Sequence, residues 1–400
     1  MGSYHLYGDF EELQRHKIIA EISTDALAYN YKLLCSRTEG CEHICVVKAD
    51  AYGHIADICV RELLSLGCRF FAVSCIEEAI SVRKICLDEG INARVLILGY
   101  TDPSLASVLS KYDIIQTLLS LENAYALDAE AKAANCIVRA HVAVDTGMNR
   151  IGVCACSPSE CITAADEIET LTKLEFVRLE GIFTHFARSD EEGSVTLAPH
   201  SHTAIQGERF KNVIELLGAR GIRLFTHACN SAASVRFPGL AFDAVRLGIM
   251  LYGVYPSRYV EKIGLKPVMR LKTVIAHIHT VPAGETVSYG GTYKAQTETS
   301  VATLPIGYAD GFIRAYTGAA VTVLTKNGAK HANVVGRVCM DQCMIDVTGL
   351  DVQVGDEVVI FGEDENTLSR LASLAGTIEY ECLCLISARV PRIKSERTVR

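Results

Sequence analysis

The first 255 residues alternate between short apolar runs and stretches with helical spacing. Apolar residues recur with a 3.6-residue period at 79–86 and 210–217, which predicts amphipathic helices. Strands that alternate with helices pair in parallel, and eight such units match a closed (β/α)8 TIM barrel. An open, doubly wound sheet would show the same runs, so periodicity favours the barrel only modestly. The predicted strands are 45–47, 70–73, 95–98, 114–115, 140–144, 181–183, 224–226 and 244–247.

The pattern changes near residue 265. Strand-like runs at 274–279, 300–304, 320–323 and 357–361 follow, separated by glycine-containing turns, which is typical of a mostly β domain. We therefore expect a barrel over residues 17–265 and a β-rich C-terminal domain over 266–400. The early apolar run at 17–22 precedes the barrel and could join the second sheet.

Composition narrows the class of protein. A length of 400 residues suits two or three domains. The net charge of −8 at pH 7 argues against nucleic acid or an acidic membrane as a partner. No apolar run reaches the roughly 18 residues of a membrane span, and the N-terminus lacks the features of a secretory signal. We expect a cytoplasmic chain, or the cytoplasmic domain of a longer membrane-bound protein.

The sixteen cysteines predict no chemistry of their own. They are scattered through apolar segments, and no Cys-x-x-Cys pair occurs. Free cysteine is a small, commonly buried side chain, and the spacings do not match a zinc site. We expect reduced thiols and no bound metal.

Polar residues follow the predicted strands where a barrel builds its active site. Lys48 follows the first strand, Arg150 the fifth, His185 the sixth and Ser231 the seventh, and Arg246 lies in the eighth. Taken one at a time, each has an ordinary explanation. Lys48 could be a solvated loop lysine, His185 a core histidine, and Arg150 the partner of Asp145 in an ion pair. Together they suggest a lysine Schiff base with a phosphorylated carbonyl compound, either pyridoxal 5′-phosphate (PLP) or the sugar substrate of an aldolase.

Ordered motifs decide between these two. From about residue 17 to 394 the chain resembles bacterial alanine racemases. The resemblance implies a PLP-binding barrel followed by a β domain. It also implies a homodimer in which each second domain covers the partner's barrel mouth. The matching segments are 46–54 (VVKADAYGH), 145–150 (DTGMNR), 181–186, 230–233, 246–249, 287–290 (VSYG), 305–311 (PIGYADG) and 336–342 (GRVCMDQ).

Site roles follow from the same resemblance. Lys48 resembles the lysine that holds PLP and acts as one base, and Tyr289 resembles the opposing base from the partner subunit. Arg246 corresponds to the arginine that faces the pyridine nitrogen, and Arg150 to the residue near the phenolic oxygen and the substrate carboxylate. The remaining matches are Tyr52, Ser231, Gly248 and Ile249 around the phosphate, His185 and Asn230 beside the cofactor, and Tyr308, Met340 and Asp341 on the partner's substrate side.

Two positions depart from the family pattern. Ala143 stands where many relatives have a carbamylated lysine that supports the arginine. Ala388 stands where relatives have a tyrosine that bonds the phosphate and walls off the substrate side chain. The missing phenol leaves room beside the substrate β-carbon. We therefore expect the chain to accept serine as well as alanine, as in the related serine racemases of vancomycin resistance.

The predicted function is interconversion of L- and D-alanine, of L- and D-serine, or of both, which supplies D-amino acids for peptidoglycan precursors. Two alternatives share the barrel and the cofactor. A PLP-dependent decarboxylase would lack Tyr289 and would present a glycine run to the phosphate. A non-catalytic PLP-binding protein would consist of the barrel alone.

Overall fold

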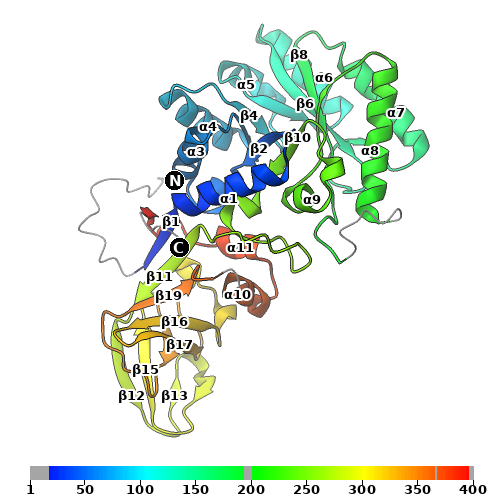
Figure 1. Ribbon diagram of the computed structural model, residues 1–400. Coiled ribbons are helices and arrows are strands. Elements are labelled where there is room, and N and C mark those ends of the chain that lie inside the picture. The colour runs from blue at the N-terminus through cyan, green and yellow to red at the C-terminus, as the bar shows by residue number, and fades with distance from the viewer. Residues whose placement is uncertain (1–17, 193–200, 365–366, 396–400) are drawn as a thin grey trace.

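The first domain is a closed parallel barrel (Figure 1). The computed structural model describes residues 18–192, 201–364 and 367–395. Each barrel strand pairs in parallel with its neighbours, and pairing of Gln116 with Ala140 closes the ring. This closure confirms the barrel and excludes the open sheet. The strands are β2 (Glu42–Val46), β3 (Phe70–Val73), β4 (Arg94–Ile97), β5 (Ile115–Leu118), β6 (Val138–Asp145), β8 (Val177–Phe183), β9 (Phe225–His227) and β10 (Ala244–Leu247), and the short β7 (Val153–Cys154) extends the sheet beside β6.

Helices alternate with these strands and cover the barrel. Several begin where the sequence supplies a serine: the side chains of Ser23, Ser120, Ser157 and Ser201 each accept a backbone N–H of the first helical turn. Such caps satisfy N–H groups that have no partner inside the helix. The segments are α1 (Thr24–Arg37), α2 (Lys48–Tyr52), α3 (Ala56–Ser65), α4 (Ile76–Asp88), α5 (Ala106–Lys111), α6 (Leu121–Ala133), α7 (Pro158–Leu171), α8 (His202–Ala219) and α9 (Ser231–Arg236).

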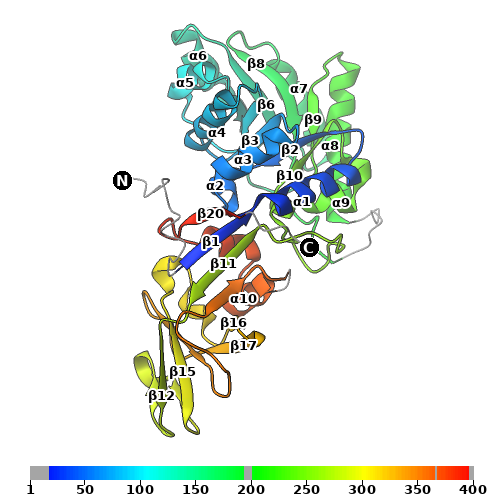
Figure 2. The ribbon, with the colours of Figure 1, turned by 60° about the vertical axis from the view of Figure 1, so that its left-hand side comes forward.

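The second domain is built on a nine-stranded sheet that includes β1, the first strand of the described residues (Figure 2). β1 (Ile18–Ser23) pairs antiparallel with β11 and parallel with β20; Lys17, the start of the predicted run, lies outside the described residues. The order is β12-β15-β18-β17-β16-β19-β11-β1-β20. The remaining bounds are β11 (Met269–Val274), β12 (His277–Val281), β15 (Thr299–Leu304), β16 (Ala320–Thr325), β17 (Gly328–Val335), β18 (Cys343–Asp346), β19 (Glu357–Phe361) and β20 (Arg392–Ser395), with a small hairpin of β13 (Thr286–Val287) and β14 (Tyr293–Lys294).

The prediction of one strand over 274–279 is wrong. The run is divided between β11 and β12, which lie far apart in the sheet. Ile275 and Ala276 lie between them, and their N–H groups donate to the carbonyls of Asp356 and Thr303 on different neighbours. A continuous apolar run shows that a segment is buried, but it does not show where the segment changes partners.

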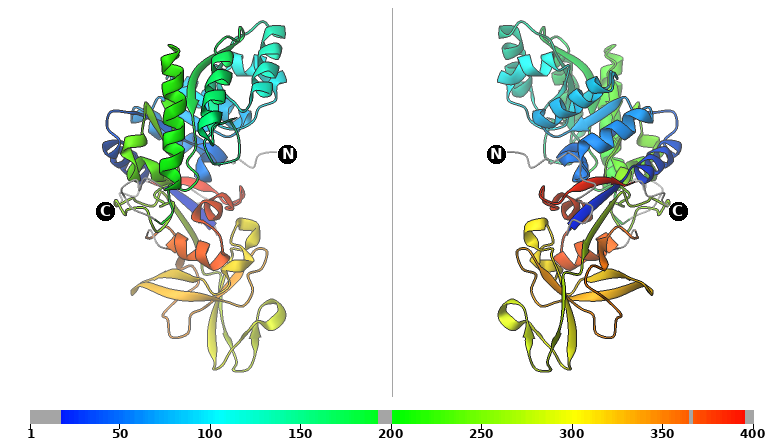
Figure 3. Two further views of the ribbon diagram at one scale, coloured as in Figure 1. Left: turned by 90° about the vertical axis from the view of Figure 1, so that its right-hand side faces the viewer. Right: turned by 90° about the vertical axis from the view of Figure 1, so that its left-hand side faces the viewer.

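Sequence periodicity also missed several elements of this domain. β17 exposes five of its eight residues, so it carries no continuous apolar run. Helices α10 (Thr367–Ala375) and α11 (Glu379–Cys384) are short and lie between the sheet and the barrel (Figures 1 and 3). Helix α11 contacts α2, so the second domain meets the barrel beside the residues that follow β2.

Two further observations concern the cysteines and the length and hydrophobicity of the helices. All sixteen cysteines are free thiols, and Cys154 and Cys384 are the two exposed ones. Within the described residues, no helix is both long enough and apolar enough to cross a membrane.

Candidate active site

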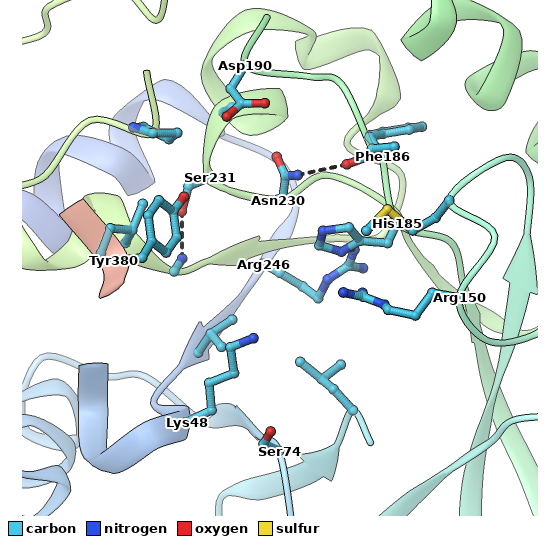
Figure 4. A pocket seen from close by; sticks show the side chains of 18 of the residues that line it. Lys48, Ser74, Arg150, His185, Phe186, Asp190, Asn230, Ser231, Arg246 and Tyr380 are labelled. Atoms are coloured by element: carbon cyan, nitrogen blue, oxygen red, sulfur yellow. Dashed lines mark hydrogen bonds between the residues drawn. The ribbon is translucent and has the colours of Figure 1, made fainter. Parts of the chain in front are cut away.

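A pocket of about 590 Å³ opens at the carboxyl ends of the barrel strands (Figure 4). The barrel residues that line it extend along the chain from Val46 to Pro256, because parallel strands end at the same edge of a barrel. The predicted residues that the structure brings together here are Lys48, Tyr52, Arg150, His185, Asn230, Ser231, Arg246, Gly248 and Ile249.

Lys48 begins a turn with an unusual backbone. Residues Ala49, Asp50, Ala51 and Tyr52 all have φ between 52° and 56°, so α2 is a left-handed turn rather than a right-handed helix. For L-residues this conformation costs roughly 1–2 kcal/mol per residue. Such strain persists where the surroundings hold it and is concentrated at functional sites.

Side chains from several elements hold the left-handed turn. The Glu78 carboxylate accepts the Ala49 N–H at 2.6 Å, and the Asp50 carboxylate accepts the Ala56 N–H at 2.7 Å. The buried His54 ring lies 3.0 Å through Nδ1 from the carbonyl oxygens of Ala51 and Tyr52. Because these carbonyls can only accept, Nδ1 carries the proton.

The charge state of Lys48 is set by its surroundings. Burial, and next the positive charge of Arg150, hold the pKa of Lys48 below its usual value, while Glu78 opposes this effect. A lowered pKa increases the fraction of neutral amine, which is the form that attacks a carbonyl or accepts a proton.

Arg246 lines the pocket, and hydrogen bonds hold its guanidinium on several sides. Nη1 donates to Nδ1 of His227 at 2.7 Å, and Nη2 donates to the carbonyls of Thr184 and Ala228 at 2.8 and 2.7 Å. Burial lowers the pKa of Arg246 to about 10. This value is still far above neutrality, so the guanidinium keeps its proton and acts as a donor.

A second buried histidine extends this arrangement into the barrel. Since Nδ1 of His227 accepts from Arg246, its Nε2 carries the proton and donates to Nδ1 of His141 at 3.0 Å. Burial lowers the pKa of His141 to about 3 and holds that of His227 well below its usual range. A Cβ on Gly181 would lie 2.5 Å from the His141 ring, so the ring fits because residue 181 is glycine. The positive charge therefore stays on Arg246.

His185 lies beside Arg246 and Arg150 (Figure 4). Its Nδ1 is 3.3 Å from Nη2 of Arg246 and can only accept from it. Burial, and next the charges of Arg246, Arg150 and Lys48, hold the pKa of His185 well below its usual value. His185 is therefore neutral, and the cations of the pocket are Lys48, Arg150 and Arg246.

The hydroxyls of Tyr52 and Ser231 converge beside Gly248, which has no side chain to fill the space between them. Ser231 Oγ accepts the Gly248 N–H at 2.8 Å. A Cβ on Gly248 would lie 3.0 Å from the Tyr52 hydroxyl and 3.4 Å from Ser231 Oγ. Burial raises the pKa of Tyr52, so its hydroxyl remains a donor. This cradle suits an anionic group.

Arg150 follows a turn organised by Asp145, and the alternative ion pair between them is wrong. The Asp145 carboxylate accepts the N–H groups of Gly147, Met148, Asn149 and Arg150 at 2.9–3.0 Å. No ion pair joins the two side chains within the described ranges. The turn fixes the backbone at Arg150 and leaves its guanidinium available to the pocket.

The residues assigned to the substrate side lie elsewhere on the same chain. Tyr289, Met340 and Asp341 line a separate hollow in the second domain. Tyr289 is 70% exposed and Met340 54% exposed. Tyr308 is 41% exposed and is not part of this lining as described. Ala388 is exposed and does not line the Lys48 pocket among the described residues.

The pocket includes residues that the sequence analysis missed. Tyr380 and Ile378 reach it from the segment of α11, and Asp190 lies after β8. Asp190 lies seven residues after the predicted strand at 181–183, in the loop region where a barrel places its site residues, and this location was the available signal. Tyr380 carried no such signal, because α11 belongs to the second domain. Over the described ranges, no cluster of three or more histidine, cysteine or acidic side chains could hold a metal.

A closed (β/α)8 barrel with a lysine, a guanidinium and a hydroxyl cradle at its carboxyl end is typical of enzymes that bind a phosphorylated carbonyl cofactor. Family models described as the alanine racemase N-terminal and C-terminal domains match residues 22–256 and 268–394. The chain belongs to the alanine racemase family.

Individual relatives are similar to this chain over nearly its whole length. Alanine racemase 1 of Clostridium acetobutylicum is 44% identical over 383 residues, 94% of each chain. A solved alanine racemase of Clostridium difficile is 39% identical, with a TM-score of 0.85 over 95% of this chain and 96% of that one. That of Bacillus anthracis, solved with bound L-Ala-P, is 33% identical, with a TM-score of 0.84 over 95% of each chain.

The family is PLP-dependent, and the residues of the pocket fit this cofactor. Lys48 carries a primary amine, the type of group that bonds to an aldehyde such as that of PLP. The cradle beside Gly248 suits its phosphate, and Arg246 supplies a fixed hydrogen-bond donor in the same pocket.

Proposed function

We propose that this chain is an alanine racemase that uses PLP and two bases, Lys48 and Tyr289 of the partner subunit. The observation that carries this proposal is the division of the predicted site residues into two groups. Lys48 and the cofactor residues share one pocket, whereas Tyr289 lies 70% exposed on a separate surface. An exposed tyrosine on one subunit and an open pocket on the other make a complete site in a homodimer.

When bound, PLP withdraws electrons from the substrate α-carbon and so makes its proton more acidic. Racemisation then needs a proton acceptor on one face of the α-carbon and a proton donor on the other. Nζ of Lys48 serves one face and the phenolic oxygen of the partner's Tyr289 the other. The lowered pKa of Lys48 supports its use as a base.

The other residues bind and orient. Tyr52, Ser231 and the Gly248 backbone would hold the phosphate, with Ile249, and Asn230 and His185 would flank the ring. Arg246 would face the ring nitrogen as a permanent donor, so that this nitrogen gains no proton. Arg150 would contact the phenolic oxygen and the substrate carboxylate. The partner's Tyr308, Met340 and Asp341 would complete the substrate side.

The two parts of the chain then have different tasks. Residues 17–265 hold the cofactor and one base, and residues 266–400 give the second base to a neighbouring subunit. D-alanine formed in this way would supply peptidoglycan precursors.

One experiment tests the main proposal. Purified protein with PLP is incubated with L-alanine in D₂O, and the product is analysed by chiral chromatography and mass spectrometry. We expect D-alanine with deuterium at the α-carbon, and the same from the D-enantiomer in reverse. Release of CO₂ with ethylamine would show a decarboxylase instead. PLP binding without either product would show a binding protein. Both results would overturn the proposal.

We also propose that the enzyme accepts serine, which would relate it to the serine racemases of vancomycin resistance. The support is the small side chain of Ala388, at a position where the family resemblance implies a tyrosine; Ala388 itself is exposed and lies outside the lining of the Lys48 pocket. The test compares kcat/KM for L-serine and L-alanine in the wild type and in Ala388→Tyr. We expect tyrosine to lower the serine-to-alanine ratio of kcat/KM at least tenfold, which corresponds to about 1.4 kcal/mol. An unchanged ratio would contradict the argument.

A further inference from the structure

One short segment connects the Lys48 pocket to the surface that carries Asp341. It begins with α11, where Tyr380 lines the pocket, and continues through residues 385–392. Figure 1 shows α11 between the barrel and the second sheet. Within this segment, Arg392 and Arg389 make contacts in opposite directions.

Arg392 fixes the segment to the barrel. Its Nε donates to the carbonyl of Gly53, directly after the left-handed turn, at 3.1 Å. Its Nη groups donate to the carbonyls of Ile386 and Val390 at 2.6 and 2.8 Å. A Cβ on Gly53 would lie 2.7 Å from the carbonyl oxygen of Leu383. The segment is therefore held closely against the turn that begins at Lys48.

Arg389 reaches the other way and bridges two carboxylates. Its Nε donates to Oδ1 of Asp310 at 2.7 Å, and its Nη2 donates to Oδ1 of Asp341 at 2.6 Å. These two contacts raise the pKa of Arg389. Asp310 is 2% exposed, and its other oxygen accepts the Gly307 N–H at 2.9 Å. Hydrogen bonds between charged groups are strong and directional.

The backbone around Asp341 is equally constrained. Tyr308 and Ala309 donate their N–H groups to the carbonyls of Cys339 and Met340 at 3.0 Å. A Cβ on Gly307 would lie 2.3 Å from the Met340 carbonyl oxygen. The Met340 carbonyl thus faces inward, while the Asp341 side chain is turned to Arg389.

We propose that Arg389 is a positioning residue for the loop at 339–342, which would meet the substrate carboxylate in the neighbouring site. This inference rests on the proposed function and adds to it a residue outside both pockets. Arg389 holds the Asp341 carboxylate in place and offsets its negative charge, which would otherwise repel the substrate carboxylate. Through Asp341 it also fixes the orientation of the Met340 backbone.

The first test separates substrate binding from catalysis and from cofactor binding. We expect Arg389→Met to raise KM for L-alanine about tenfold, while kcat changes less than twofold and PLP affinity is unchanged. Arg389→Lys keeps one charged contact, so its KM for L-alanine should rise less than that of Arg389→Met. Arg61→Met is the matched control. Arg61 is 38% exposed, against 42% for Arg389, and pairs with Asp57 and Glu89 on the barrel, so its kinetics should equal those of the wild type.

The second test asks which subunit uses Arg389. A heterodimer of a Lys48→Ala subunit and a Tyr289→Phe subunit has one competent site. This site takes Lys48 from the second subunit and both Tyr289 and the 339–342 loop from the first. Arg389→Met should raise KM when it is placed in the Lys48→Ala subunit, and much less when it is placed in the other. Equal effects from the two placements would overturn the proposal.

Folding needs its own control, since Arg389→Met leaves the buried Asp310 carboxylate unpaired. The double variant Asp310→Asn/Arg389→Met removes this charge and should show the same rise in KM. An unchanged KM, or a loss of PLP affinity with an unchanged KM, would overturn the role of Arg389 while leaving the racemase assignment intact. A wild type that forms no D-alanine would overturn the proposed function and the substrate-loop role with it.

Discussion

Lys48 and Tyr289 both lie beside backbone with positive φ, but in opposite environments. The residues after Lys48 form a left-handed turn inside the pocket, and carboxylates and a buried histidine hold it. Tyr289 follows Ser288, whose φ is 67° and whose hydroxyl donates to the Arg337 carbonyl at 2.6 Å, yet Tyr289 itself is 70% exposed. One region is built to enclose a ligand and the other to present a side chain outward. The proposed site, divided between two subunits, would use one region of each kind.

The largest expected effect comes from removing the enclosed group. Lys48→Ala should abolish the visible absorbance of bound PLP and lower kcat by at least about 10⁴, because the proposed covalent attachment and one proposed base would be lost together. Absorption spectra and D-alanine formation measure both. Lys84→Ala, on the exposed face of α4, is the control and should keep both properties. A coloured and active Lys48→Ala protein would contradict the role of the barrel pocket.

The presented group should act on the reaction without affecting the cofactor. We expect Tyr289→Phe to keep the PLP spectrum and to lower kcat by about 10²–10⁴, the range for loss of a general acid or base. Tyr125→Phe, 47% exposed on α6, should be unaffected. If Tyr289→Phe lost PLP, Tyr289 would belong to the cofactor pocket rather than to the outward surface.

The positive charge of Arg150 should be visible in the pH dependence of PLP binding. Arg150 lowers the pKa of Lys48, so Arg150→Met should raise it. The neutral amine then forms at higher pH, and the midpoint for the rate of PLP binding should move upward by about 0.5–1 pH unit. Stopped-flow absorbance between pH 6 and 11 measures this midpoint. Arg178→Met, with its side chain 70% exposed on β8, should leave it in place; a downward shift for Arg150→Met would refute the electrostatic argument.

Acid should weaken the fold through the buried His54 of the barrel. Burial lowers the pKa of His54 to about 4, against about 6.5 for an unfolded chain. Because the unfolded state binds the extra proton, the stability contributed by neutral His54 is present above pH 6.5 and falls as the pH drops towards 4.

His54→Gln should remove up to about 2 kcal/mol of the stability difference between pH 8 and pH 5. Urea unfolding at the two pH values measures this. His277→Gln, on the exposed strand β12, should leave the difference as in the wild type. Equal pH dependence in His54→Gln and the wild type would show that His54 does not titrate in this way.

The sequence determined the parts of the molecule that depend on local pattern. Apolar runs located the eight barrel strands to within a few residues, because a buried parallel strand must be apolar on both faces. The rule that a barrel places its active site after the strands then selected Lys48, Arg150, His185, Ser231 and Arg246, and the structure brings them into one pocket. Motif resemblance supplied their proposed roles.

Only the tertiary structure decided the features that depend on distant partners. The division of 274–279 between two strands follows from which neighbours accept its N–H groups. Tyr380 reaches the pocket because α11 packs on α2. Arg389 bridges Asp310 and Asp341 across 79 and 48 positions of chain. Local patterns of hydrophobicity report whether a residue is buried, but the geometry of a charge network is set by how separate segments pack.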